Sequence, residues 1–148
     1  MERQLLAWHK SNPVSQRLAS IPGIGPIIAT AIATTVADPN VFRSGREFAA
    51  WLGLVPRQDS SGGKPKLLGM SKRGDTYLRT LLIHGARSAI LAAQKKSKPN
   101  VWLSALLTRR HPNIAAVALA NKNARTVWAL LAHEREFRPD YMPRPATV

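Results

Sequence analysis

The chain has 148 residues, a formal net charge of +14 at pH 7 and a pI near 11.5. Such an excess of positive charge indicates a polyanionic partner and says nothing about the fold. The absence of cysteine excludes disulfides, thiolate metal sites and a cysteine nucleophile. No apolar run could span a bilayer, and the charged first twenty residues do not resemble a secretory signal. We therefore expect a single folded core in a cytoplasmic, DNA-facing protein with no membrane partner.

Capping residues and helical spacing predict an all-α chain. The expected helices cover residues 2–11, 13–20, 26–36, 44–51, 75–93, 101–110 and 112–132. Pro13 and Pro112 suit the first position of a helix, Ser44 and Glu47 form a capping box, and Asp75 is the expected N-cap of the longest helix. Residues 54–70 are rich in glycine and proline, so we expect a long loop there, with room for a small hairpin.

These elements divide the chain into three parts. Residues 1–12 resemble the end of a helix that leads in from a preceding part. Residues 13–136 form the helical domain, and residues 137–148, with three prolines, form a flexible tail.

A helix-hairpin-helix signature lies within residues 15–36, where residues 18–32 read LASIPGIGPIIATAI. Gly23 and Gly25 allow positive φ and a close approach of the turn to a ligand. Ile24 is expected to plug the turn into the core, and Ala29 to be small where the two helices cross. Because a helix starts at Pro26, its free amides and the positive end of its dipole could hold a DNA phosphate without reading sequence. The plainer alternative is a tight turn with no ligand.

Residues 57–87 combine a loop of small residues with a dense positive charge. Ser60 and Ser61 are followed by two glycines, which leaves their hydroxyls exposed enough to attack a phosphodiester. No histidine lies close in sequence to take the serine proton, so a solvated linker beside a phosphate-binding patch is the plainer interpretation of the composition. The expected phosphate-binding cations of this stretch are Arg57, Lys64, Lys66, Lys72, Arg73, Arg79 and Arg87.

Several motifs in order resemble one protein family over residues 18–128. They read IPGIGP at 21–26, FAAWLGLVPRQ at 48–58, SSGGK at 60–64, SKRGD at 71–75, LR at 78–79, GAR at 85–87 and ALANKNAR at 118–125. Together they resemble the C-terminal domain of the insertion-sequence transposases numbered one-ten, and especially their eleven-eleven branch. The resemblance implies a prokaryotic, nucleoid-associated recombinase.

The same resemblance implies how the work is divided in the full-length protein. An N-terminal RuvC-like half carries metal-binding carboxylates, with magnesium the expected ion, and a structured guide RNA directs insertion by a homo-oligomer. The C-terminal domain supplies a serine that joins covalently to DNA. Ser61 fits that place best because Gly62 follows it and Lys72 lies eleven residues later, with Ser60 as the alternative.

Met1 falls just before the helix-hairpin-helix, so we expect this chain to lack the RuvC-like half, to hold no metal or other cofactor itself and to be inactive alone. The eight acids are scattered and make no pair at metal-ligand spacing. A different class of function stays open, namely a non-catalytic helix-hairpin-helix module that grips DNA or RNA.

Two further groups of residues have competing interpretations. Lys122 and Arg125 interrupt an apolar helix together with two asparagines, which indicates a nucleic-acid contact, a polar brace for the serine loop, or simple exposure. Trp51, Trp102 and Trp128 occupy apolar helical positions, so we expect them in the core rather than as base-stacking platforms. Trp8 could pack on the missing half.

Overall fold

The computed structural model describes residues 2–54, 72–95, 101–134 and 137. Within these ranges the fold is all-α, as predicted, and holds no strand. The expected small hairpin falls in residues 55–71, outside the described part of the chain. The helices are α1 (Glu2–Ser11), α2 (Pro13–Ala19), α3 (Pro26–Thr35), η1 (Pro39–Val41), α4 (Gly45–Trp51), α5 (Lys72–Gln94), α6 (Val101–Arg109) and α7 (Pro112–His133).

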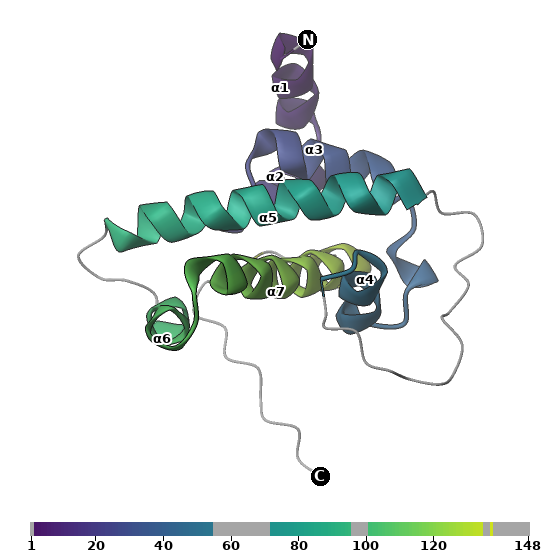
Figure 1. Ribbon diagram of the computed structural model, residues 1–148. Coiled ribbons are helices and arrows are strands. Elements are labelled where there is room, and N and C mark those ends of the chain that lie inside the picture. Colours follow the sequence, from purple (N-terminus) through teal and green to yellow (C-terminus); the bar gives the residue numbers. More distant parts are fainter. Residues whose placement is uncertain (1, 55–71, 96–100, 135–136, 138–148) are drawn as a thin grey trace.

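The two long helices α5 and α7 pack on each other and organise the fold (Figure 1). Leu78, Leu82 and Ala86 of α5 are buried, and so are Ala120 and Ala124 of α7. Alanine on the packed face of α7 leaves room for the α5 helix, while the buried leucines of α5 supply apolar area to the contact. The pair of helices is therefore a rigid base on which the shorter helices are mounted.

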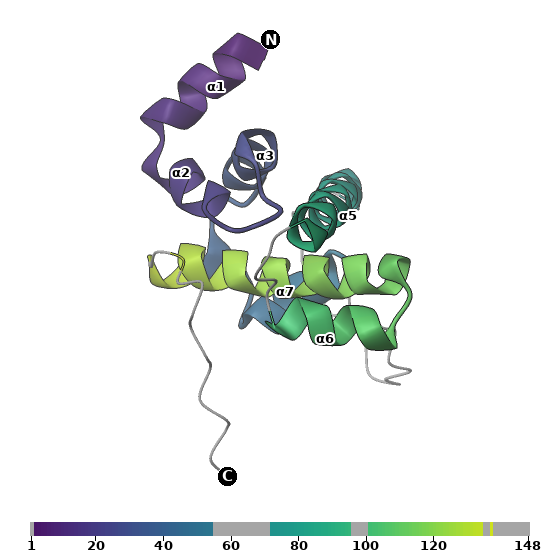
Figure 2. The same cartoon turned by 90° about the vertical axis from the view of Figure 1, so that its left-hand side faces the viewer.

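The shorter helices pack around this base. Helix α4 and the one-turn η1 pack against α7, and α3 packs against α5. Helix α6 runs beside the N-terminal half of α7 (Figure 2), and α1 projects from α2 and α3 away from the α5–α7 pair. An aromatic cluster closes the α4 corner, where the Phe42 and Phe48 rings meet edge to face at 5.1 Å and the Trp51 ring lies 5.5 Å from that of Phe42.

Local capping chemistry accounts for several helix boundaries. The Asn12 side chain accepts from the Ser15 N–H at 3.0 Å, and the Ser44 hydroxyl accepts from the Glu47 N–H at 3.2 Å. His111 Nδ1 accepts from the Asn113 N–H at 3.2 Å in front of α7. Pro13, Pro26 and Pro112 each stand in the first helical turn, where their missing N–H costs no hydrogen bond.

Two boundaries differ from the sequence prediction. Helix α5 begins at Lys72, three residues before the expected cap Asp75, so Asp75 lies inside the helix. Residues 72–74 contain no proline, and glycine at 74 is tolerated in a first turn, so nothing stops the helix from extending backward. The short η1 was not predicted. The Asp38 side chain accepts from the Asn40 N–H at 2.9 Å and turns three residues that show no helical periodicity.

Candidate nucleic-acid interface

The turn between α2 and α3, residues 20–25, is held from inside the protein. Ile21 and Ile24 are each 2 % exposed, and the Ile24 N–H donates to the Ile21 carbonyl at 3.0 Å. Asn123 of α7 donates through Nδ2 to the Pro22 carbonyl at 3.0 Å. The prediction that Ile24 anchors the turn is confirmed. The buried Asn123 is thus a polar brace for the α2–α3 turn.

Gly23 has no room for a side chain. Its φ is +98°, and a Cβ placed there would lie 3.1 Å from Asn123 Nδ2 and 3.1 Å from the Gly85 carbonyl oxygen. The contact is reciprocal, because a Cβ on Gly85 would collide with the Gly23 carbonyl oxygen and lie 3.0 Å from Ile28 Cδ1. Two glycines far apart in sequence thus let α5 meet the turn backbone to backbone. This packing alone accounts for Gly23.

Gly25 differs from Gly23 both in its backbone conformation and in the space around it. Its φ is −86°, so the expectation of positive φ at this position was wrong. It is exposed, and a Cβ built on it would meet nothing within 4 Å. It immediately precedes α3, whose N-terminus has no side-chain cap and whose first residues, Pro26 and Ile27, are exposed. Neither the fold nor the backbone conformation therefore requires a glycine here.

The Arg79 side chain reaches from α5 to the C-terminal end of α4. Its Nη1 donates to the Leu52 carbonyl at 3.4 Å, and its guanidinium occupies the space beside Gly53, where a Cβ would come within 2.7 Å of Nη1. Helix α4 ends in a Schellman motif, in which the Leu54 N–H donates to the Ala49 carbonyl and Gly53 has φ +76°. A cation here complements the negative end of the helix dipole. Arg79 therefore ties α5 to the C-terminal end of α4, two residues before Leu54, the last described residue ahead of the 55–71 segment.

The other predicted cations of this stretch are spread out. Arg87 is exposed on α5, eight residues beyond Arg79. Lys72 and Arg73 lie in the first turn of α5, and their side chains are not described. The predicted nucleophiles and the rest of the basic set lie outside the described residues, namely Ser60, Ser61, Arg57, Lys64 and Lys66.

Lys122, Arg125 and Trp102 form what we call the α6–α7 surface. Trp102 is 39 % exposed, so the expectation that it belongs to the core was wrong. The Lys122 Nζ atom lies 4.2 Å from the centroid of its ring, a cation–π contact between α7 and α6. The pKa of Lys122 is lowered, first by burial of its ammonium and second by the positive charge of Arg125. Arg125 itself is exposed.

Trp51 and Trp128 are half-buried and pack on the core as predicted. The Trp128 Nε1–H donates to the Pro39 carbonyl at 2.9 Å, so it fixes η1 to α7. Asn121 Oδ1, next to Lys122, is buried and accepts no hydrogen bond in the part of the chain that is described.

Sequence reasoning missed two arginines beside the α6–α7 surface. A Cβ on Gly45 would lie 2.9 Å from the Arg125 carbonyl oxygen and 3.0 Å from its Cα, so the start of α4 rests directly on the α7 backbone. Arg43 and Arg46, both exposed, lie within two residues of Gly45, so their backbone runs close to that of Arg125. No local pattern connects residues 43–46 with residue 125, which is why the sequence carried no signal for them.

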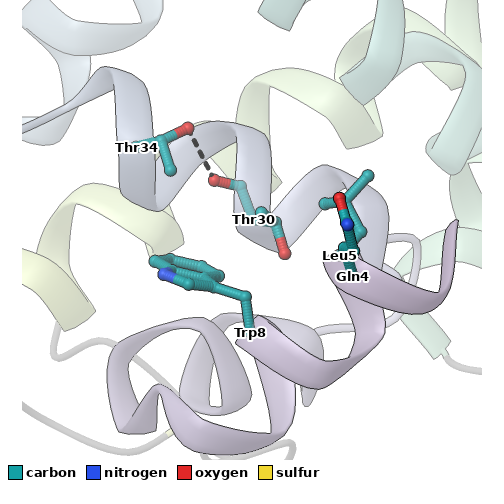
Figure 3. A pocket seen from close by; sticks show the side chains of 5 residues that line it. All are labelled: Gln4, Leu5, Trp8, Thr30 and Thr34. Carbon is teal, nitrogen blue, oxygen red and sulfur yellow. Dashed lines mark hydrogen bonds between the residues drawn. The ribbon is translucent and has the colours of Figure 1, made fainter. Parts of the chain in front are cut away.

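A pocket of about 270 Å³ lies elsewhere, between α1 and α3. The Trp8 indole faces Thr30 and Thr34 across it, and Gln4 and Leu5 complete the lining (Figure 3). Thr34 Oγ1 donates to the Thr30 carbonyl at 2.9 Å and so uses its hydroxyl within α3. No lining residue is charged, so the pocket does not suit a polyanion.

The described residues offer neither a metal-binding cluster nor a membrane span. No group of three His, Asp or Glu side chains there could hold a metal ion. No described helix has both the length and the hydropathy of a membrane span.

Comparison with known proteins identifies the class to which these features belong, the insertion-sequence transposases. The profile of the Transposase IS116/IS110/IS902 family matches residues 15–101, which include the glycine turn, the serine segment and α5. The chain belongs to this family. No solved structure matches the chain.

The relatives include three transposases that match most of this chain. A "Probable family 20 transposase" of Pseudomonas aeruginosa is 56 % identical over 140 residues, which cover 94 % of this chain and 41 % of the relative. The transposase for insertion sequence element IS1111A of Coxiella burnetii is 49 % identical, with coverage of 93 % and 38 %. The transposase for insertion sequence element IS1328 of Yersinia enterocolitica is 45 % identical, with coverage of 88 % and 39 %. The chain thus spans about two-fifths of the length of these relatives.

Proposed function

We propose that this chain is the DNA-binding, serine-bearing part of an insertion-sequence transposase, which acts by cleaving and rejoining DNA strands through a phosphoserine link. The observation that carries the proposal is the pair Ser60–Ser61, set among cations within the residues that match the transposase family. The segment holding this pair connects Leu54, packed at the end of α4, with the start of α5. Fixed ends of this kind restrict where a reactive serine between them can lie relative to a substrate.

Serine chemistry suits transposition for an energetic reason. Ser61 Oγ attacks phosphorus, the bond from phosphorus to one deoxyribose oxygen breaks, the serine loses its proton and the released hydroxyl gains one. The phosphodiester energy is retained in the phosphoserine, so a second DNA hydroxyl can reverse the reaction and join a new strand. Cations near the phosphate would stabilise the charge that develops on its oxygens.

Binding to DNA is proposed on two features. The chain is strongly basic, and the uncapped N-terminus of α3 is exposed beside Gly25, where it could receive a phosphate. A RuvC-like half with a magnesium site is part of the proposed working assembly, since the chain accounts for only part of the length of its relatives. A guide RNA and a homo-oligomer complete the proposal on the family resemblance.

The test is serine substitution in a full-length transposase that carries this chain. We expect Ser61→Ala to abolish the covalent protein–DNA species while duplex affinity stays within about twofold, because a neutral hydroxyl adds little to a grip that rests on phosphate charge. The adduct is measured by denaturing electrophoresis of labelled DNA, and duplex affinity by fluorescence anisotropy.

Ser60→Ala is the matched control, and it should keep partial activity. Loss of the adduct in Ser60→Ala but not in Ser61→Ala would move the nucleophile by one residue. Retention of the adduct in the double variant would reduce the loop to a linker and leave the non-catalytic binding module as the function.

A further inference from the structure

Among the described aromatic side chains, Trp102 is the one whose position helix packing explains least. Helix α6 packs on α7 through Leu103, which is 6 % exposed, whereas Trp102 is 39 % exposed and Val101 beside it 83 %. An indole exposed to this extent loses much of the hydrophobic gain that would justify it as a packing residue. Its ring is covered instead by the ammonium of Lys122 at 4.2 Å.

The α7 cations beside this ring have no acidic neighbours along the chain. There is no aspartate or glutamate between Asp75 and Glu134, a stretch that includes all of α6 and α7. Lys122 and Arg125 are three residues apart and so project from one side of α7. The contact of Gly45 with the Arg125 backbone adds two exposed arginines, Arg43 just before α4 and Arg46 in its first turn, with the acidic Glu47 following Arg46. Like charges gathered in this way repel one another, and an anion from outside relieves the repulsion.

The combination of one exposed indole with a short row of cations matches a particular ligand chemistry. In a duplex the faces of the bases are stacked on each other and cannot reach an aromatic side chain. In an unpaired strand each base presents a free face, and its phosphates follow at a spacing that neighbouring cations can meet. A surface that only gripped duplex backbone would have no use for the ring.

We propose that the α6–α7 surface binds an unpaired nucleic-acid strand, with one base stacked on Trp102 and the flanking phosphates held by Lys122, Arg125 and the arginines at 43 and 46. This inference rests on the proposed function, since it assumes a nucleic-acid partner, and it assigns that partner's single-stranded part to a named site. In the free protein the Lys122 ammonium covers the ring. On binding it moves to a phosphate, and the base takes its place.

The experiment compares two exposed tryptophans. Trp102→Ala is tested against Trp8→Ala, because Trp8 is 36 % exposed but lines the uncharged pocket between α1 and α3. The 148-residue chain is titrated with dT12, with rU12 and with a 12-base-pair duplex at one fixed salt concentration. Affinity is followed by anisotropy, and base stacking by quenching of tryptophan fluorescence.

We expect Trp102→Ala to lose about tenfold in affinity for a single strand, and most of the quenching, while duplex affinity stays within about twofold. Trp8→Ala should match the wild type in every measurement. Trp102→Phe should keep most of the single-strand affinity, because it preserves both an aromatic face and the packing of α6. The stronger of the dT12 and rU12 arms identifies the source of the strand as DNA or RNA.

Equal losses in Trp102→Ala and Trp8→Ala, or equal losses for single strand and duplex, would overturn the inference. So would unchanged single-strand affinity in Trp102→Ala. Duplex binding and the Ser61 adduct measure the proposed function separately. If duplex binding and the adduct remain while Trp102→Ala leaves single-strand affinity unchanged, the inference alone is wrong. If the wild-type chain binds none of the three nucleic acids, the inference and the proposed function are both wrong.

Discussion

The α2–α3 turn and the α6–α7 surface differ in why their unusual residues are present. Packing requires those of the turn, whereas packing does not account for those of the surface. In the turn, Gly23 is required from within, because the backbone at Gly85 and the Asn123 side chain fill the space where its side chain would stand. On the α6–α7 surface, Trp102 contacts the Lys122 ammonium and still remains 39 % exposed. A residue that the fold itself demands is weak evidence for a ligand. A conspicuous residue that the fold leaves exposed is stronger evidence, even where no sequence motif marks it.

The largest test of this comparison is Gly85→Ala. Alanine normally stabilises a helix interior by about 1 kcal/mol relative to glycine. Here its Cβ would collide with the Gly23 carbonyl oxygen, and overpacking of this kind against backbone costs about 3 kcal/mol, so packing outweighs propensity. We expect a clear fall in the free energy of unfolding, measured from the urea midpoint.

Gly25→Ala is the matched control for Gly85→Ala, because nothing lies within 4 Å of its added Cβ and φ is −86°. It should change stability by less than about 1 kcal/mol, the scale of an N-cap substitution. If both variants lose the same stability, the distinction between internally required and accessible glycines is wrong.

A smaller effect concerns Arg79 and Gly53 at the end of α4. Gly53→Ala should cost about 1 kcal/mol, because its φ of +76° strains any residue with a Cβ. Part of this loss of stability comes from displacing the Arg79 guanidinium. In a chain that carries Arg79→Met, that part of the loss would be absent. The free energies of unfolding of the two single variants and the double variant should therefore be non-additive by about 0.5 kcal/mol or more. Additive values would show that the guanidinium does not occupy this site in solution.

The smallest effect is electrostatic and lies on the α6–α7 surface. Arg125→Gln should raise the pKa of Lys122 toward its ordinary value of 10.5, but not fully, because burial is the larger cause of the lowering and remains. NMR titration of the Lys122 side chain measures this shift. An unchanged pKa would mean that the two cations are not neighbours.

The same lowered pKa fixes the sign of a stability effect. Between the folded-state pKa of Lys122 and 10.5 the unfolded chain binds more protons, so the contribution of Lys122 to the free energy of unfolding rises as the pH rises through that window. Arg125→Gln should narrow the window.

The sequence by itself determined the helices and the left-handed glycine at position 23. Prolines in first turns and the side chains of Ser44 and Asn12 act on amides two or three residues away, so these boundaries depend only on neighbours in the chain. Periodicity likewise placed Leu78 and Leu82 in the core. At the start of α5 the local signal at Asp75 was misleading, and the local cap of η1 at Asp38 was too short a signal to predict a helix from.

Only the tertiary structure decided which residues are required by packing and which are left for a partner. Asn123 braces a carbonyl 101 residues away, and Gly45 and Gly85 are small because a distant backbone lies against each of them. Trp102 has the same apolar neighbours in sequence as a core residue, and its exposure follows from how α6 lies on α7. Contacts between distant segments depend on the angle and distance at which whole helices pack, and no window of the sequence contains that information.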